Sequence, residues 1–214
     1  NPAEFSALLD LGLRLTFLLT LPAAIGLAML GVPLLATLFQ HGAFTANDVL
    51  LTREALAAYS IGLIGMILVK VLAPGFYAQQ NIKTPVKIAL LTLLATQAMN
   101  LAFIVPFKHA GLALSIGLAS CLNASLLFRG LRQRAVYVPQ PGWMKFGLKI
   151  AAALLVLAAT LWFGMGREAD WLVAPTWTRV AHLSALVSAG AAAYFATLGL
   201  LGFRLRDFRR KGTA

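Results

Sequence analysis

Charged residues are scarce in this sequence: they make up 12% of its 214 residues, whereas 60% are hydrophobic. Ordinary soluble domains carry about 25% charged residues. A chain of this size could not hide so much apolar surface in a soluble core. The composition therefore predicts a polytopic membrane protein.

Cysteine, carboxylate and histidine side chains are also few. Cys121 is the single cysteine, which excludes an intrachain disulfide and a cysteine-based metal site. The seven carboxylates lie in connections or near the ends of apolar runs, and the three histidines lack metal-ligand spacing. We therefore predict no catalytic centre, no metal site and no cofactor. The basic runs lack interleaved aromatic residues, so nucleic-acid binding is not expected either.

Six apolar runs have about the 20 residues that a membrane-spanning helix needs. They cover residues 7–30, 55–77, 86–105, 112–128, 146–165 and 180–203. We predict an all-α protein with six transmembrane helices, a short surface helix at 33–39 and a tight turn at 106–111.

The runs also divide the chain into parts. Residues 1–128 are predicted to form a four-helix part of a lobe, and the basic linker 129–145 joins it to an additional helix pair at 146–203. A basic tail follows at 204–214. Because the sequence begins Asn1-Pro2 without an initiator methionine, we expect it to be a piece of a longer protein.

Lys and Arg are unevenly distributed between the two ends of these runs. Most belong to the 78–87 corner, the 129–149 connection, the tail, or positions 14 and 70. The other side has only four of the 18, namely Arg53, Lys108, Arg167 and Arg179. Because positive residues collect in cytoplasmic loops, we predict that both termini are cytoplasmic. The same positive charges favour contact with anionic membrane lipids.

Local patterns predict how two of the helices begin. Thr45 and Asp48 have the spacing of a capping box, which predicts a helix from about Ala46 into the second run. Thr84 is a suitable N-cap for the third run, with Pro85 as its first helical residue.

Small residues predict where helices approach one another, and tryptophans predict where the chain meets the membrane interface. One small-residue stripe has four-residue spacing (Ala113, Gly117 and Cys121), and a second one lies in the last run (Ser184, Ser188, Ala192 and Ala196). Such stripes let another helix approach closely. The tryptophans Trp143, Trp171 and Trp177 are interpreted as residues of the aromatic belt at the membrane interface.

The stretch 59–87 carries the most unusual pattern, because Lys70 and Pro74 interrupt an apolar run. Proline removes a backbone hydrogen bond to the carbonyl four residues earlier, which here belongs to Lys70. Lys70 is interpreted either as a positive charge facing a substrate cavity or as a side chain that snorkels to the headgroups. Tyr77 and the polar corner after it are either part of a cytoplasmic gate or an ordinary interfacial turn.

Three polar residues lie inside the third run: Thr96, Gln97 and Asn100. Thr96 and Asn100 share a helix face. These residues are either part of a substrate or ion site or interhelical hydrogen-bonding residues.

Long motifs of the chain resemble a known family. The segment AYSIGLIGMILVKVLAPGFYAQQNIKTPVKIA, with LFQHGAFTANDVLLTREALAAYS before it and KHAGLALSIGLASCLNASLL after it, is similar to the MurJ/MviN lipid II flippase family. PQPGWM resembles the linker before that family's thirteenth helix. The family belongs to the multidrug/oligosaccharidyl-lipid/polysaccharide exporter superfamily. By this resemblance the six runs correspond to its helices nine to fourteen.

The resemblance implies one part of a two-lobe transporter of the bacterial inner membrane. Such a transporter carries undecaprenyl-pyrophosphate-linked peptidoglycan precursor, lipid II, to the periplasmic leaflet by alternating access. Its partners would be lipid II, membrane lipids and the N-terminal helices of the same chain. The family's essential arginines lie in helices outside this sequence, and 146–203 corresponds to a groove for the lipid tail.

Some relatives are proposed to bind a cation on helices eleven and twelve. The corresponding positions here are near Thr96, Asn100 and Ser115, and none of these residues is a carboxylate. The substrate or gating candidates are Lys70, Pro74, Tyr77, Gln97 and Asn100. Two other functions are left open by the sequence: export of another polyprenyl-linked oligosaccharide, and a non-transporting membrane scaffold for cell-wall proteins.

Overall fold

A computed structural model describes residues 2–203, and within them every regular element is a helix. The helices are α1 (Pro2–Met29), α2 (Gly31–Leu38), α3 (Ala46–Tyr77), α4 (Lys83–Gln133), α5 (Trp143–Met165), α6 (Glu168–Val173) and α7 (Thr176–Leu200). Five of the described helices, α1, α3, α4, α5 and α7, are long and apolar enough to cross a membrane. The all-α membrane fold is therefore confirmed. The number of crossings and the side of the termini stay predictions, and the tail 204–214 lies outside the described residues.

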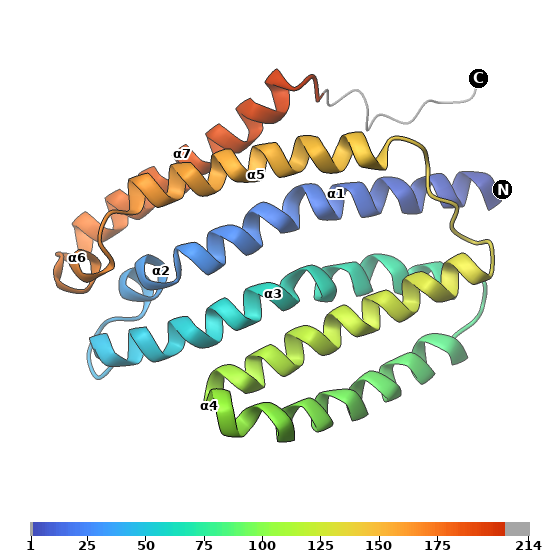
Figure 1. The fold of residues 1–214 in the computed structure, drawn as a ribbon, viewed down its shortest axis with the longest axis horizontal. Helices are drawn as coiled ribbons and strands as arrows, with labels where there is room; N and C mark the ends of the chain where they lie inside the picture. The colour runs from blue at the N-terminus through green and yellow to red at the C-terminus, as the bar shows by residue number, and fades with distance from the viewer. Residues whose placement is uncertain (1, 204–214) are drawn as a thin grey trace.

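Helix α4 is folded back on itself, so that its two arms lie side by side (Figure 1). The reversal is at Lys108, whose φ of 49° and ψ of −127° are not helical. A Cβ atom at Gly111 would collide with the carbonyl group of Phe103, so glycine lets the two arms come together there. The predicted turn at 106–111 is thus confirmed, and the arms 83–107 and 109–133 contain the third and fourth predicted spans.

Helix α1 lies between two groups of helices (Figure 1). On one side, Leu9 and Leu13 of its N-terminal half share a core with α3, α4 and the linker, which includes Leu72 of α3. On the other side, Leu18 and its neighbours belong to a core that also includes residues of α2, α5, α6 and α7. The side chain of Trp143 packs against both cores. Helix α1 therefore joins the α3–α4 group to the α5–α7 pair.

Small residues bring α3 and α4 into backbone contact, as the first stripe predicts. A Cβ atom at Gly62 of α3 would collide with the backbone of Gly117, and one at Gly65 would lie 2.5 Å from the Cys121 nitrogen. Close approach of this kind increases van der Waals contact between helices in a membrane.

The second small stripe does not pack this way. Ser184, Ser188, Ala192 and Ala196 are exposed, whereas α7 meets α5 through the opposite set around Leu186, Gly190 and Tyr194. Within the described residues no helix packs on this stripe, so a close helix contact along it stays a prediction.

Of the two predicted helix starts, one is confirmed and one is wrong. The capping box is present: the Asp48 backbone nitrogen donates to Thr45 Oγ1, and the Thr45 nitrogen donates to the Asp48 carboxylate. The prediction that Thr84 is an N-cap is wrong, because α4 already begins at Lys83. Asn81 Oδ1 accepts from the Thr84 nitrogen at 3.2 Å and so satisfies this end of the helix.

The three tryptophans have different environments. Only Trp177 is strongly exposed, at 84%. Trp171 is buried and its indole nitrogen donates to the Met165 carbonyl at 2.8 Å. The interpretation of Trp171 as a belt residue is therefore wrong: its side chain fixes the short helix α6 onto the end of α5.

Candidate functional site

The predicted gating residues lie together on one exposed face of α3. Lys70, Pro74 and Tyr77 follow the i, i+4, i+7 spacing of a helix face, and all three are exposed. Within the described residues, Lys70 has no hydrogen-bond or ion-pair partner. Its side chain is therefore available to lipid headgroups or to a ligand, and the choice between these two roles stays a prediction.

The polar residues of the predicted cation site are mostly engaged within their own helices. Thr96 Oγ1 donates to the Thr92 carbonyl at 2.7 Å, and the buried Ser115 Oγ donates to the Gly111 carbonyl at 2.8 Å. Asn100 Nδ2 lies 3.5 Å from Gln97 Oε1, and Asn100 Oδ1 is buried without a partner among the described residues. In the part of the chain that the structure describes, no three His, Cys, Asp or Glu side chains gather as metal ligands. The role of these residues stays a prediction.

A network that the sequence analysis missed holds the linker against α1. Asp10 is 3% exposed, and its Oδ1 accepts from the Tyr137 hydroxyl (2.7 Å), the Trp143 Nε1 (2.8 Å) and the Gln140 nitrogen (3.1 Å). Its Oδ2 accepts from Arg14 Nε at 2.8 Å. A buried carboxylate needs such compensation because an isolated charge is costly to desolvate.

Arg14 completes this network from the next turn of α1. Its Nη2 donates to the Pro141 carbonyl at 3.0 Å, and its guanidinium carbon lies 5.3 Å from the centre of the Trp143 ring. Arg14 is therefore a cation held between a carboxylate, a carbonyl and an indole ring.

Two further contacts extend the attachment along the linker. Ser6 Oγ accepts from the Val138 nitrogen at 2.9 Å and lies 3.2 Å from the Val138 carbonyl. Burial, followed by the hydrogen bond to Asp10, raises the pKa of the Tyr137 hydroxyl well above its usual value. The hydroxyl thus stays protonated at physiological pH and remains a donor to the carboxylate.

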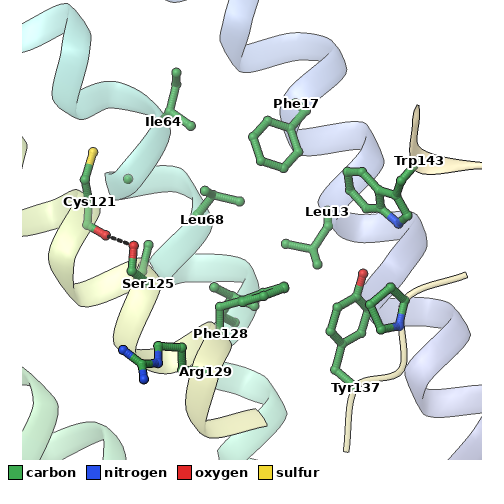
Figure 2. A pocket seen from close by; sticks show the side chains of 14 residues that line it. Leu13, Phe17, Ile64, Leu68, Cys121, Ser125, Phe128, Arg129, Tyr137 and Trp143 are labelled. Carbon is green, nitrogen blue, oxygen red and sulfur yellow. Dashed lines mark hydrogen bonds between the residues drawn. The ribbon is translucent and has the colours of Figure 1, made fainter. Parts of the chain in front are cut away.

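Beside this network lies a cavity of about 500 Å³ (Figure 2). Residues from α1, α3, the second arm of α4 and the linker line it: Leu13, Phe17, Ile64, Gly65, Leu68, Leu72, Cys121, Ala124, Ser125, Phe128, Arg129, Tyr137, Pro139 and Trp143. Figure 2 shows Phe17 and Ile64 toward one end, with Arg129 and Tyr137 toward the other. Most of the lining is apolar, and Arg129 is its only charged residue.

A second polar cluster lies at the opposite end of the helices, around the largely buried Arg179 at the start of α7. Its Nη1 donates to the Ala36 carbonyl at 2.8 Å and to Gln40 Oε1 at 3.0 Å, and its Nη2 donates to the Leu172 carbonyl at 3.0 Å. A cation near the last carbonyl groups of α2 also complements the dipole of that helix. Arg179 therefore joins α2, α6 and α7.

The sequence contained one signal for the Asp10 network. Asp10 and Arg14 lie four residues apart in an otherwise apolar helix, and this spacing favours an ion pair. Nothing in the local pattern indicated that residues about 130 positions later would supply the other donors.

Comparison with known proteins gives a consistent match. The family described as "Lipid II flippase MurJ" matches residues 1–181. The Lipid II flippase MurJ of Burkholderia cenocepacia is 49% identical over 97% of this chain and 40% of its own length. The probable lipid II flippase MurJ of Haemophilus influenzae is 39% identical over 95% of this chain and 40% of its own length.

A solved structure shares the fold. It is described as lipid II flippase MurJ in an inward closed conformation, and it matches with a TM-score of 0.72 at 22% identity. The match covers 92% of this chain and 41% of that chain. The present chain thus spans about two fifths of the length of the proteins it matches.

Proposed function

This chain belongs to the lipid II flippase MurJ family, and we propose that it forms the C-terminal part of a transporter that moves lipid II across the bacterial inner membrane. The observation that carries the proposal is the 49% identity to a lipid II flippase over 97% of the chain. The family is one of transporters, which agrees with the expectation that the chain is not an enzyme.

Lipid II sets a simple physical requirement for its transporter. Its pyrophosphate, sugars and peptide need a path shielded from hydrocarbon, whereas its undecaprenyl tail stays soluble in the membrane. In a transporter that alternates access, two lobes rock around such a path. We propose that residues 1–128 supply four helices of one lobe and that 146–203 form the additional pair beside which the lipid tail passes.

The topology proposed for the chain has six crossings, with the two arms of α4 counted separately. Lys70, on the side richer in Lys and Arg, would then face the cytoplasmic leaflet from which lipid II loads. The exposure of its side chain and the lack of a partner among the described residues support this role. Tyr77 and Pro74 on the same face would take part in opening this side, and Gln97 and Asn100 would contact substrate or neighbouring helices.

The main anion-binding residues of the transporter are expected in helices that precede this chain. The present residues would therefore position the lobe and the lipid tail, and the N-terminal helices would bind the pyrophosphate. A cation site at Thr96, Asn100 and Ser115 would have only hydroxyl and amide oxygens as ligands and no carboxylate to neutralise the bound charge.

The test is depletion of the complete protein in a strain with no second flippase, followed by measurement of lipid II in the outer leaflet. The proposal predicts that outward lipid II falls while total lipid II is maintained or rises. Unchanged outward lipid II, with loss of another polyprenyl-linked oligosaccharide at the cell surface, would favour the related exporter function. Unchanged transport of both, together with mislocalised cell-wall proteins, would favour the scaffold.

A further inference from the structure

A proline inside α1 leaves one backbone carbonyl group without its usual donor. Pro22 lies within this helix, and it has no N–H to donate to the carbonyl four residues earlier, which is that of Leu18. In the membrane interior no bulk water replaces the missing donor, so a neighbouring helix has to supply one. Leu18 is buried in the core that α1 shares with α5 and α7. Its carbonyl is therefore a specific attachment point for a donor from that side.

Tyr194 of α7 supplies this donor. Its hydroxyl donates to the Leu18 oxygen at 2.8 Å, and the two residues are 176 positions apart. Tyr194 is 1% exposed and is one of the largest fully buried side chains among the described residues. A buried hydroxyl needs a partner as much as the freed carbonyl does, so each group satisfies the other. Sliding or rotation of α7 against α1 would leave both groups unpaired, which opposes such motion.

Two further polar contacts hold the α5–α7 pair near its ends. At the start of α5, Trp143 Nε1 donates to the buried Asp10 carboxylate of α1 at 2.8 Å. At the opposite end of the pair, Arg179 Nη1 donates to the Ala36 carbonyl of α2 at 2.8 Å. The contact on Leu18 lies between these two levels along α1 and α2. Contacts at three levels fix the position and the tilt of the pair, which a single contact would not.

The two helices of the pair are themselves closely packed, side by side (Figure 1). A Cβ atom at Gly164 of α5 would lie 2.6 Å from Leu186 Cδ1, and one at Gly190 of α7 would lie 2.9 Å from Leu161 Cδ2. Packing of this density transmits displacement from one helix to the other, so α5 follows α7.

We propose that the α5–α7 pair is fastened to α1 as one rigid body, and that Tyr194 is the positioning residue that holds them together by pairing with the carbonyl freed by Pro22. Separate units in one chain move against each other by default unless a large apolar interface joins them, and here the buried core around Leu18 does so. During transport the pair would keep its place on the lobe and would not act as a separate gate; this last step rests on the proposed function.

A double-mutant cycle in the full-length transporter, purified in detergent, tests the contact between Tyr194 and the freed carbonyl. Tyr194→Phe removes the donor and should lower the melting temperature by a few degrees. In the Pro22→Ala background the same change should cost less than half as much, because the alanine nitrogen donates to the Leu18 carbonyl as in a regular helix. The matched control Tyr59→Phe removes an exposed hydroxyl and should leave the melting temperature unchanged in both backgrounds. Equal losses for Tyr194→Phe in the two backgrounds, or no loss in either, would overturn the proposal.

Spin labels test the rigid attachment itself. Cysteines replace the exposed residues Leu155 of α5 and Leu94 of α4 in a full-length protein that has no other cysteine, and pulsed electron paramagnetic resonance in nanodiscs gives the distribution of distances between the two labels. We expect one narrow distribution, which Tyr194→Phe broadens and Tyr59→Phe does not.

Two results would contradict the rigid attachment. A broad or two-peaked distribution with Tyr194 intact would show that the pair moves independently of the other helices. An unchanged width in folded Tyr194→Phe would show that its hydroxyl does not position the pair. Neither the melting temperatures nor the label distances depend on lipid II transport, so a failure of the proposed function is distinguished from a failure of this proposal.

Discussion

The hydroxyl of Tyr137 offers a direct test of how the linker is attached to α1. Its hydrogen bond to Asp10 Oδ1 is 2.7 Å long and buried, and Tyr137 itself is 2% exposed. Tyr137→Phe removes this donor and leaves the ring in place. The Asp10 carboxylate retains three donors, from Arg14, Gln140 and Trp143.

The expected cost follows from the charge of the acceptor. Hydrogen bonds to charged groups contribute about 1.5–3 kcal/mol, roughly twice the contribution of neutral ones. If the linker opens locally while the helices stay folded, this cost raises the population of the open linker about 10- to 150-fold. Asp10→Ala should open it further, because it orphans three donors and leaves Arg14 without its carboxylate.

The assay is limited trypsin digestion of the full-length protein in lipid nanodiscs, followed at the peptide bond after Arg134. Residues 136 and 137 are buried, so a protease needs the linker to detach before it can bind around this bond. When opening is fast relative to cleavage, the rate follows the open population. Tyr59→Phe, which removes an exposed hydroxyl from α3, is the matched control and should not change the rate. Equal rates for Tyr137→Phe and Tyr59→Phe would refute the assigned role of the network.

Three further predictions concern other parts of the chain. Gly62→Ala should destabilise the α3–α4 contact by about 1–3 kcal/mol through overpacking, whereas Gly147→Ala, with open space around it, should not lower the melting temperature. Arg179→Met should lower the melting temperature by several degrees, because it removes three hydrogen bonds. Arg53→Ala, the control, breaks a half-exposed ion pair worth about 0–1 kcal/mol and should change the melting temperature little. Lys70→Ala should lower the rate of lipid II transport, and Lys70→Arg should preserve it. Normal transport by both variants would show that Lys70 only snorkels to the headgroups.

The helices could be predicted because their signals are local. A run of about 20 apolar residues is sufficient to indicate a spanning helix, and the capping box at Thr45 lies within four residues. The break between the two arms of α4 was also visible, as a cluster of proline, charge and glycine around Lys108. The start of α4 was misplaced by a few residues because Asn81, and not Thr84, satisfies its first turn.

The candidate site could not be predicted in this way because it depends on contacts between distant segments. Asp10 was interpreted only as a carboxylate near a helix end, yet its partners come from the linker and α5. The small-residue stripe on α7 illustrates the same limit, since periodicity identifies a face but not which face meets a neighbour. Arg129 was counted only as a linker charge, and its position at the cavity edge depends on how three helices pack.

The most direct test of the central claim is a chimera in the Burkholderia cenocepacia flippase, in which the aligned segment is replaced by this chain. The identity of 49% over 97% of the chain makes the exchange conservative. The account predicts that the chimera restores outward lipid II in cells depleted of their own flippase, to a level close to that of the intact protein. A chimera that is folded and inserted in the membrane but leaves lipid II in the inner leaflet would contradict it.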